Sequence, residues 1–363
     1  MSRSSALETS NPLPPPIFQQ AVWLTNVDSQ VMHSRANLDR GLRQLAALGF
    51  NTIYPVVWQR GYTLYPSPVA AKLTGAVVLP DSPFVGRDML AEIIELAAPL
   101  KIRVIPWWEY GLMVPPKSPL ARLHPELLTI DRRGSLQRIQ GASGQPDPQV
   151  WLNPCDDRVR EFVVETIGDL VARYPVAGVQ LDDHFALPVE LGYDKLTQQL
   201  FAAQPHANWD EWRREQLTGL LAEIASRVRA IRHDCLVSIS PNPLGFAKSR
   251  YLVDWQRWCD LGLVDELVLQ VYRDRLDAFA GEISKPEVRA IKTKIPTLIG
   301  ILTGLRTKPI STESIAAQID LTIASEFGGF ACFFYETLFH EQLSPQLVSR
   351  DPQQLMAILR AKS

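Results

Sequence analysis

The chain contains no glycine-rich phosphate-binding signature, because neither GxGxxG nor GxxxxGK[ST] occurs in its 363 residues. This absence disfavours a doubly wound nucleotide-binding sheet. No grouping of Ser, Cys and His resembles a nucleophile elbow. Lysine and arginine form no block, and the formal net charge is −2. We therefore expect neither a nucleic-acid partner nor binding to an anionic membrane surface.

Cysteine is scarce, and the four cysteines share no CxxC spacing: Cys155, Cys235, Cys259 and Cys332. We predict buried free thiols rather than zinc ligands or a disulfide framework, which suits a reducing compartment. No apolar run is long enough to span a membrane, and residues 1–17 lack the apolar core of a signal peptide. As written, the sequence predicts a cytoplasmic protein.

What the chain does contain is enough apolar sequence for a large core, with 46% hydrophobic and 21% charged residues. Its length is about that of one (β/α)8 barrel with insertions. Residues 1–16 are polar and proline-rich and predict a disordered arm. Residues 17–363 are expected to form the barrel, and the sequence does not predict the oligomeric state.

Eight short apolar runs rich in Val, Ile or aromatic residues predict β-strands. None alternates in the manner of a half-solvated sheet, so each is expected to be buried on both faces. The predicted strands are Gln20–Asn26, Thr52–Val57, Arg103–Trp108, Ala177–Asp182, Leu236–Ser240, Glu266–Val271, Thr297–Leu302 and Gly329–Tyr335.

Amphipathic helices alternate with these strands. Leu38, Leu42, Leu45 and Leu48 form the apolar stripe of the first, which ends at Gly49. Further helices are predicted after a cap at Asp156 or Asp157, and over residues 212–231, 311–324 and 352–359. Eight strands alternating with helices predict an α/β fold, a single parallel (β/α)8 TIM barrel. The connections over residues 58–86, 108–156 and 183–208 are long and follow strands, so they are expected to wall the catalytic face.

The residues at the strand ends indicate the chemistry, because these ends converge on one face of a parallel barrel. Carboxylates, aromatic rings and amides dominate there, which suits a carbohydrate site with two carboxyl groups in catalysis. The predicted substrate-binding residues are Trp58, Trp108, Tyr110, Asn153, Gln180, His184, Asn242, Gln270, Tyr272 and Glu336. Trp209, Trp212, Trp255 and Trp258 lie at helical spacing and are assigned to core packing instead.

Asp182 and Asp183 follow the apolar run that ends the fourth predicted strand. Side chains alternate along a strand, so Gln180 and Asp182 share one face while Leu181 and Asp183 share the other. Since Leu181 belongs to the layer against the helices, Asp182 is expected to point into the barrel. Asp183 is the second candidate, with capping of the following turn as the alternative reading.

Glu109 is the predicted partner of Asp182. It follows Trp107 and Trp108, and aromatic neighbours that exclude water raise a carboxyl pKa as a general acid requires. A structural salt bridge is the alternative, and Glu336 and Asp274 are reserve candidates. One Asp-Asp-His cluster without a second histidine is a weak metal signal, so no metal and no cofactor are expected.

Several of these segments together resemble the glycosyl-hydrolase-like 10 (DUF187) family. The similar segments are Ala21–Thr25, Trp151-Leu152-Asn153-Pro154, Gly178-Val179-Gln180-Leu181-Asp182-Asp183-His184-Phe185, Ile239-Ser240-Pro241 and Gln270-Val271-Tyr272. The resemblance covers roughly residues 20–340. It implies a (β/α)8 glycoside hydrolase acting on a polysaccharide or glycan strand, with Asp182 and Asp183 as the family's paired aspartates.

Two points separate this chain from related sequences. His184 stands where the family usually has tyrosine, and the seventh predicted strand ends in Thr303-Gly304 rather than in the nucleophile glutamate of family 10 xylanases. Two further hypotheses remain open. One is a carbohydrate-binding barrel without turnover, and the other is a metal-dependent hydrolase or lyase built on Asp182, Asp183 and His184.

Overall fold

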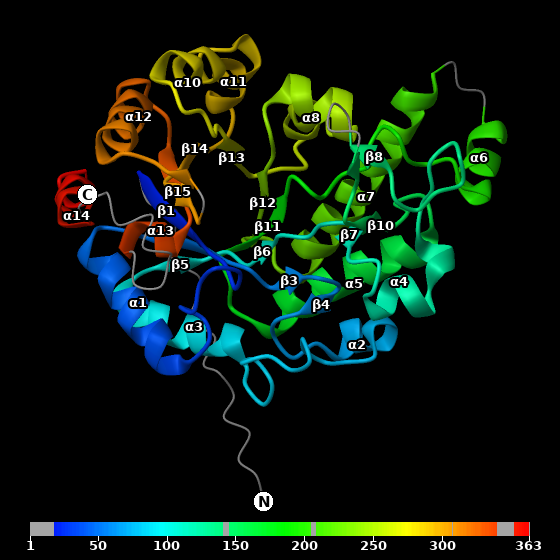
Figure 1. Cartoon of the computed structure of the whole chain (residues 1–363), viewed down its shortest axis with the longest axis horizontal. Helices are drawn as coiled ribbons and strands as arrows, with labels where there is room; N and C mark the ends of the chain where they lie inside the picture. The colour runs from blue at the N-terminus through cyan, green and yellow to red at the C-terminus, as the bar shows by residue number, and fades with distance from the viewer. Residues whose placement is uncertain (1–17, 141–144, 205–207, 307, 340–351, 363) are drawn as a thin grey trace, which may run out of the picture.

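The computed structural model describes residues 18–140, 145–204, 208–306, 308–339 and 352–362. The arm predicted over residues 1–16 lies outside this part of the chain. Within it, the strands form a central sheet that is surrounded by helices (Figure 1).

The central sheet is parallel throughout, in the order β5-β2-β1-β17-β14-β13-β12-β11-β6. Eight predicted strands correspond to these nine, because β5 and β6 lie in one predicted segment. The bounds of the predicted and observed segments agree to within two residues at each end. The strands are β1 (Gln19–Leu24), β2 (Thr52–Pro55), β5 (Arg103–Val104), β6 (Trp107–Trp108), β11 (Gly178–Asp182), β12 (Leu236–Ser240), β13 (Glu266–Gln270), β14 (Thr297–Leu302) and β17 (Gly329–Phe333).

The sheet closes through residues 103–108, which the sequence predicts as one strand and the structure divides into β5 and β6. The first half pairs with β2 and the second with β11. Backbone bonds continue across the break, because Ile105 N–H donates to the Ile53 carbonyl and Gln180 N–H donates to the Pro106 carbonyl, at 3.0 and 2.8 Å. A proline has no N–H to give to a ladder, and the regular pattern is interrupted there. The predicted (β/α)8 barrel is confirmed.

Local sequence signals set the helix ends. Asp156 accepts from the Arg158 N–H at the start of α5, and Ser311 accepts from the Ser314 N–H at the start of α12. The helices are α1 (Arg35–Ala47), α2 (Pro68–Thr74), α3 (Met89–Ala97), α4 (Pro119–Leu123), α5 (Asp157–Arg173), α6 (Lys195–Ala202), α7 (Trp209–Ile231), α8 (Leu244–Tyr251), α9 (Trp255–Asp260), α10 (Leu276–Ile283), α11 (Pro286–Lys292), α12 (Thr312–Ala324), α13 (Tyr335–Phe339) and α14 (Pro352–Arg360).

The long connections carry small elements of their own. A hairpin of β3 (Trp58–Gln59) and β4 (Tyr62–Thr63) follows β2, and β7 (Met113–Val114) pairs with β10 (Val150–Trp151) in the next connection. The other small strands are β8 (Ile139–Gln140), β9 (Gln145–Pro146), β15 (Gly304–Leu305) and β16 (Lys308–Pro309). These connections leave the carboxyl ends of the strands, where barrel enzymes place their active sites.

The core agrees with the composition-based expectations. All four cysteines are free and buried. Trp212, Trp255 and Trp258 are almost fully enclosed, as predicted for core residues. Among the described residues, no helix combines the length and the apolarity needed to cross a bilayer.

Candidate active site

Asp182 is the last residue of β11, and its side chain is held inside the barrel by the two following strands. Its Oδ1 accepts hydrogen bonds from Ser240 Oγ of β12 and from Gln270 Nε2 of β13, each at 2.9 Å. Only 7% of the residue is exposed. Gln180 points the same way and forms hydrogen bonds with Trp23 and Ser238, whereas Leu181 is buried in the hydrophobic core. The orientation predicted from strand alternation is confirmed.

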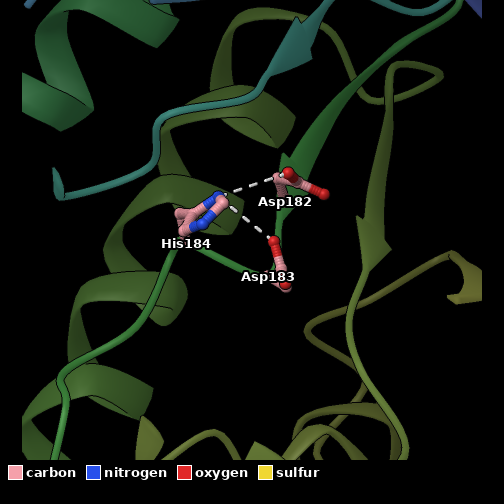
Figure 2. A group of neighbouring side chains, drawn as sticks. All are labelled: Asp182, Asp183 and His184. Carbon is pink, nitrogen blue, oxygen red and sulfur yellow. Dashed lines mark ion pairs between the residues drawn. The ribbon is translucent and has the colours of Figure 1, made fainter. Parts of the chain in front are cut away.

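His184 turns back toward both aspartates (Figure 2). Its Nδ1 lies 3.2 Å from Asp183 Oδ1, 3.6 Å from Asp182 Oδ2 and 3.2 Å from the Glu109 carbonyl oxygen. Burial opposes the imidazolium, but the negative charges of Asp183, Asp182 and Glu109 prevail and raise the pKa of His184 to about 10. At neutral pH the ring is therefore a cation placed beside both aspartates. Asn242 Nδ2 donates to the second oxygen of Asp183.

Glu109 is brought to this cluster by a close contact between two loops. Gly111 has φ +48°, and a Cβ at that position would lie 2.1 Å from the carbonyl carbon and oxygen of His184. Leu112 N–H donates to the same carbonyl oxygen at 2.9 Å. Only a glycine permits this approach, so the loop after β6 rests directly on the loop after β11.

The Glu109 carboxyl group is oriented by an amide relay. Gln59 Nε2 donates to Glu109 Oε2 at 3.1 Å, and Gln59 Oε1 accepts from Asn26 Nδ2 at 2.8 Å. Because Gln59 donates to Oε2, a proton on Glu109 belongs on Oε1. Burial and the negative charge of Asp182 raise the pKa of Glu109 to about 8, against the effects of Gln59, His184 and Arg60. Glu109 is therefore mainly protonated at neutral pH.

The pKa of Asp182 is also raised, but more of the charge on its carboxylate is compensated by neighbouring groups. Burial and the charge of Asp183 raise the pKa of Asp182 to about 7, and the bonds from His184 and Ser240 act in the opposite direction. Asp182 thus ionises at a lower pH than Glu109, which keeps its proton to higher pH, and the charge of the ionised Asp182 is compensated by His184. Such a difference is how one site supplies both an acid and a base or nucleophile.

Asp182, Asp183 and His184 are also the group that could hold a metal ion in the described part of the chain, with ligand atoms within 4.8 Å of one another. A metal requires a neutral imidazole. His184 is instead a cation whose Nδ1 faces the two carboxylates. A metal ion would therefore compete with the proton for this ring.

Four of the predicted substrate-binding residues are placed beneath the surface instead. Trp58 and Trp108 are 0% and 2% exposed, stack at 4.8 Å between ring centroids, and both donate to the Gly111 carbonyl. Asn153 is 2% exposed and donates to Asp194 and Thr197. Gln180 is fully buried. Their packing and hydrogen bonds support the site, and their burial leaves little surface for contact with a substrate.

Two more of the predicted substrate-binding residues form hydrogen bonds with other groups of the protein. Gln270 holds Asp182, as described above. Glu336 is buried and accepts from Ser29 Oγ and the Gln30 N–H at 2.9 and 3.1 Å, which fixes the loop after β1. The reserve candidate Asp274 is exposed and pairs with Lys308, outside the cluster.

The remaining predicted residues stay available to a ligand, because Tyr110, His184, Asn242 and Tyr272 are all partly exposed. Burial, followed by the charges of Asp182 and Asp183, raises the pKa of Tyr272 well above its ordinary value. The phenol is therefore a stable hydrogen-bond donor beside the carboxylates.

Sequence reasoning gave no role to Asn26, Gln59 or Ser240, although all three lie at or just after strand ends. Ser238 and Ser240 pair in register with Gln180 and Asp182 across β11 and β12. This two-residue polar spacing inside a buried strand was the available signal for an inward-facing polar layer.

Solved structures with this fold include several glycosidases. The glycoside hydrolase domain of PgaB (BpsB) from Bordetella bronchiseptica aligns with 96% of this chain and 100% of its own, with a TM-score of 0.67 and 14% identity. The α-galactosidase TtGalA from Thermus thermophilus aligns with 96% of this chain and 63% of its own, with a TM-score of 0.54 and 16% identity. At these identities the comparison establishes the barrel fold alone.

The comparison with related sequences identifies the family. The glycosyl hydrolase DigH of Escherichia coli K12 is 26% identical over 289 residues, covering 71% of this chain and 62% of DigH. The glycosyl hydrolase YngK of Bacillus subtilis is 22% identical over 293 residues, covering 70% of this chain and 54% of YngK. The matched region thus spans less than two-thirds of either relative. The family model described as Glycosyl hydrolase-like 10 matches residues 19–321. The chain therefore belongs to the glycosyl hydrolase-like 10 family.

Proposed function

We propose that this protein is a glycoside hydrolase that cleaves glycosidic bonds within a polysaccharide or glycan strand. Family membership and the fold support the reaction class. The observation that carries the proposal is the pair formed by Glu109 and Asp182. They stand at the ends of neighbouring strands, and Asp182 gives up its proton at a lower pH than Glu109, with His184 beside it to compensate the charge.

Glu109 is the general acid in this proposal. Its Oε1 proton passes to the glycosidic oxygen as the bond from that oxygen to the anomeric carbon breaks. The donor bond from Gln59 to Oε2 fixes which oxygen carries the proton. After transfer, the new carboxylate is stabilised by the nearby His184 and Arg60 charges, which already lower its pKa.

Asp182 is the nucleophile or base. Ser240 and Gln270 hold Oδ1, so Oδ2 is the reacting oxygen. It either bonds the anomeric carbon, forming a glycosyl-enzyme that water later hydrolyses, or removes a proton from an attacking water. His184 and Asp183 position this group, because the imidazolium compensates both aspartates and is itself tied to the Glu109 carbonyl.

The test compares wild type with Asp182→Asn on a panel of neutral, anionic and cationic glycans, with products read by mass spectrometry. We expect new oligosaccharides from wild type, a loss of turnover by several orders of magnitude in Asp182→Asn, and retained binding. Asp274→Asn is the matched control, since this aspartate follows β13 but is exposed and paired with Lys308. Turnover retained in Asp182→Asn would refute the assigned role.

The same panel separates the alternatives. Binding by both proteins without any product would indicate a carbohydrate-binding barrel. Turnover that EDTA abolishes and a divalent ion restores would indicate the metal-dependent hydrolase or lyase. A carboxyl-pair glycosidase is indifferent to chelation.

Two broader expectations remain proposals. One is that residues 17–363 constitute a single domain, which limited proteolysis tests through the survival of one fragment. The other is the cytoplasmic location, which fractionation of cells producing the full-length protein tests.

A further inference from the structure

A surface pocket separate from the carboxylate cluster lies among the loops that carry the candidate site. It has a volume of about 560 Å³ and is formed by the connections after β6 and β11 together with the first turn of α7. In Figure 1 this region surrounds β8, between α8 and α6. The lining residues are Asp131, Arg132, Arg133, Ile139, Val189, Glu190, Tyr193 and Asp210. We call it the β8 groove.

The β8 groove is linked to the carboxylate cluster by a short series of side chains. The rings of His184 and Trp151 lie 6.2 Å apart, and the Arg138 guanidinium lies 6.0 Å from the Trp151 ring. Arg138 then pairs with Glu190 of the groove at 3.2 Å. Both sites are therefore joined through buried side chains, and both are built on the connections after β6 and β11.

The acidic residues of the groove are each neutralised by an arginine. Asp131 pairs with Arg133 at 2.7 Å and Asp210 with Arg213 at 2.6 Å. Glu190 pairs with Arg138 at 3.2 Å and with Arg250 at 3.4 Å, and Arg138 also pairs with Asp147. These ion pairs leave the carboxylates able to accept sugar hydroxyls through their remaining lone pairs. With the lining carboxylates paired in this way, Arg132 is the lining residue that adds a positive charge to the groove.

Arg132 is exposed, and within the described ranges it makes no ion pair with a carboxylate. Its guanidinium lies 4.8 Å from the centre of the Tyr193 ring, which holds the group at the edge of the groove. A planar guanidinium presents paired N–H donors that match a carboxylate in a bidentate manner. Ile139 and Val189 add apolar surface suited to the C–H face of a sugar ring.

We propose that the β8 groove is a distal saccharide subsite that binds a sugar unit carrying a carboxylate, with Arg132 as the group that recognises the charge. The inference rests on the proposed glycosidase function and deepens it. It makes the substrate an acidic glycan that extends from the carboxylate cluster to the loops around β8. Arg132 determines specificity and is not a catalytic residue, since it lies outside the cluster of reacting groups.

The experiment measures binding to full-length Asp182→Asn, which prevents turnover. The probes are oligogalacturonate and hyaluronan oligosaccharides, each compared with the methyl ester that removes its charge. We expect the acids to bind at least about tenfold more tightly than the esters, with affinity that weakens as salt is added. Adding Arg132→Gln should remove this preference, whereas Arg132→Lys should keep part of it because the charge is retained.

Arg122→Gln on α4 is the matched control, an exposed arginine outside the groove. Equal binding of acid and ester, no binding of either acid, or an unchanged preference in Arg132→Gln would each overturn the subsite. Failure of the proposed function has a different signature, namely glycans that bind through Arg132 but are never cleaved by wild type. Cleavage that ignores both substrate charge and Arg132 would refute the subsite while sustaining the glycosidase.

Discussion

At the scale of single residues, Glu109 can serve as an acid only because of where it is held. Its pKa of about 8 reflects burial and the charge of Asp182. The protonated form exists below that pH and is lost above it, so wild-type turnover should decline as pH rises through about 8. Glu109→Gln should lower turnover by about 10²- to 10⁴-fold and abolish this alkaline decline.

Substrates with activated leaving groups distinguish this role from simple structural damage. An aryl glycoside has a leaving group that departs without being protonated. Glu109→Gln should cleave such a substrate at a rate much closer to that of wild type, as measured by release of the aryl group. Equal losses on natural and activated substrates would assign Glu109 to packing. Gln59→Leu should weaken the same activity less, because it removes the orienting amide but keeps the acid.

The sequence singled out Glu109 and Asp182 as candidates, and the structure places them at the ends of neighbouring strands, but the side chains that surround them were not predicted. Alternation along β11 oriented Asp182, since only its neighbour Leu181 suits the helical layer. Trp58 and Trp108 lie buried rather than open to a ligand. The sequence shows that a tryptophan follows a strand, but not which side of the backbone it occupies. Gln59 could not be assigned, because its reach to Glu109 depends on the β3–β4 hairpin.

At the scale of elements, the site depends on two loops in backbone contact at Gly111. Gly111→Ala would impose a Cβ 2.1 Å from His184 backbone atoms in a left-handed conformation. We expect it to separate Glu109 from Asp182, to reduce turnover at least about tenfold and to destabilise the fold by about 1–3 kcal/mol. Steady-state kinetics and denaturant unfolding measure the two effects.

Gly134→Ala is the control for strain alone. Gly134 has φ +82°, but among the described residues, its two chain neighbours apart, no atom lies within 4 Å of its Cβ position. This variant should lose about 1 kcal/mol or less and keep its turnover. If Gly111→Ala behaved in the same way, the loop contact would not position the acid.

Elements were the most predictable part of the fold. The eight buried apolar runs and the cap at Asp156 or Asp157 are local signals, and the structure contains the strands and caps α5 with Asp156. The division of residues 103–108 into β5 and β6 was not predicted. It arises from pairing with two different neighbours around Pro106, which is a property of barrel closure rather than of the segment.

At the scale of the whole molecule, the candidate site and the stability of the fold are linked through protons. The folded pKa values of Asp182, Glu109 and His184 are about 7, 8 and 10, each above its ordinary value of 3.8, 4.5 and 6.5. The folded state therefore binds these protons more tightly than the unfolded chain. Stability from each group is fully present below its ordinary pKa and is lost as pH rises through the folded value.

The unfolding free energy should accordingly fall between pH 5 and pH 9, a window chosen from these values. Acids with the opposite shift act at lower pH, whereas His33, whose pKa is lowered by burial and by Arg87, opposes the fall at the acidic end of the window, below its ordinary value of 6.5. Burial opposes the effect at Asp131, but bonds from the Ser135 N–H and Arg133 prevail and lower its pKa, so its contribution is constant across this window. Urea unfolding at a series of pH values measures the slope.

Glu109→Gln isolates the contribution of the acid itself. The amide keeps the size of the side chain but cannot ionise, so the variant should be more stable than wild type by at least about 1 kcal/mol above pH 8 and should show a shallower slope. Near pH 4, where Glu109 is protonated in both states, the difference should largely vanish. A parallel offset at every pH would mean that Glu109 titrates alike in the folded and unfolded protein, and the charge state assigned to the general acid would then be wrong.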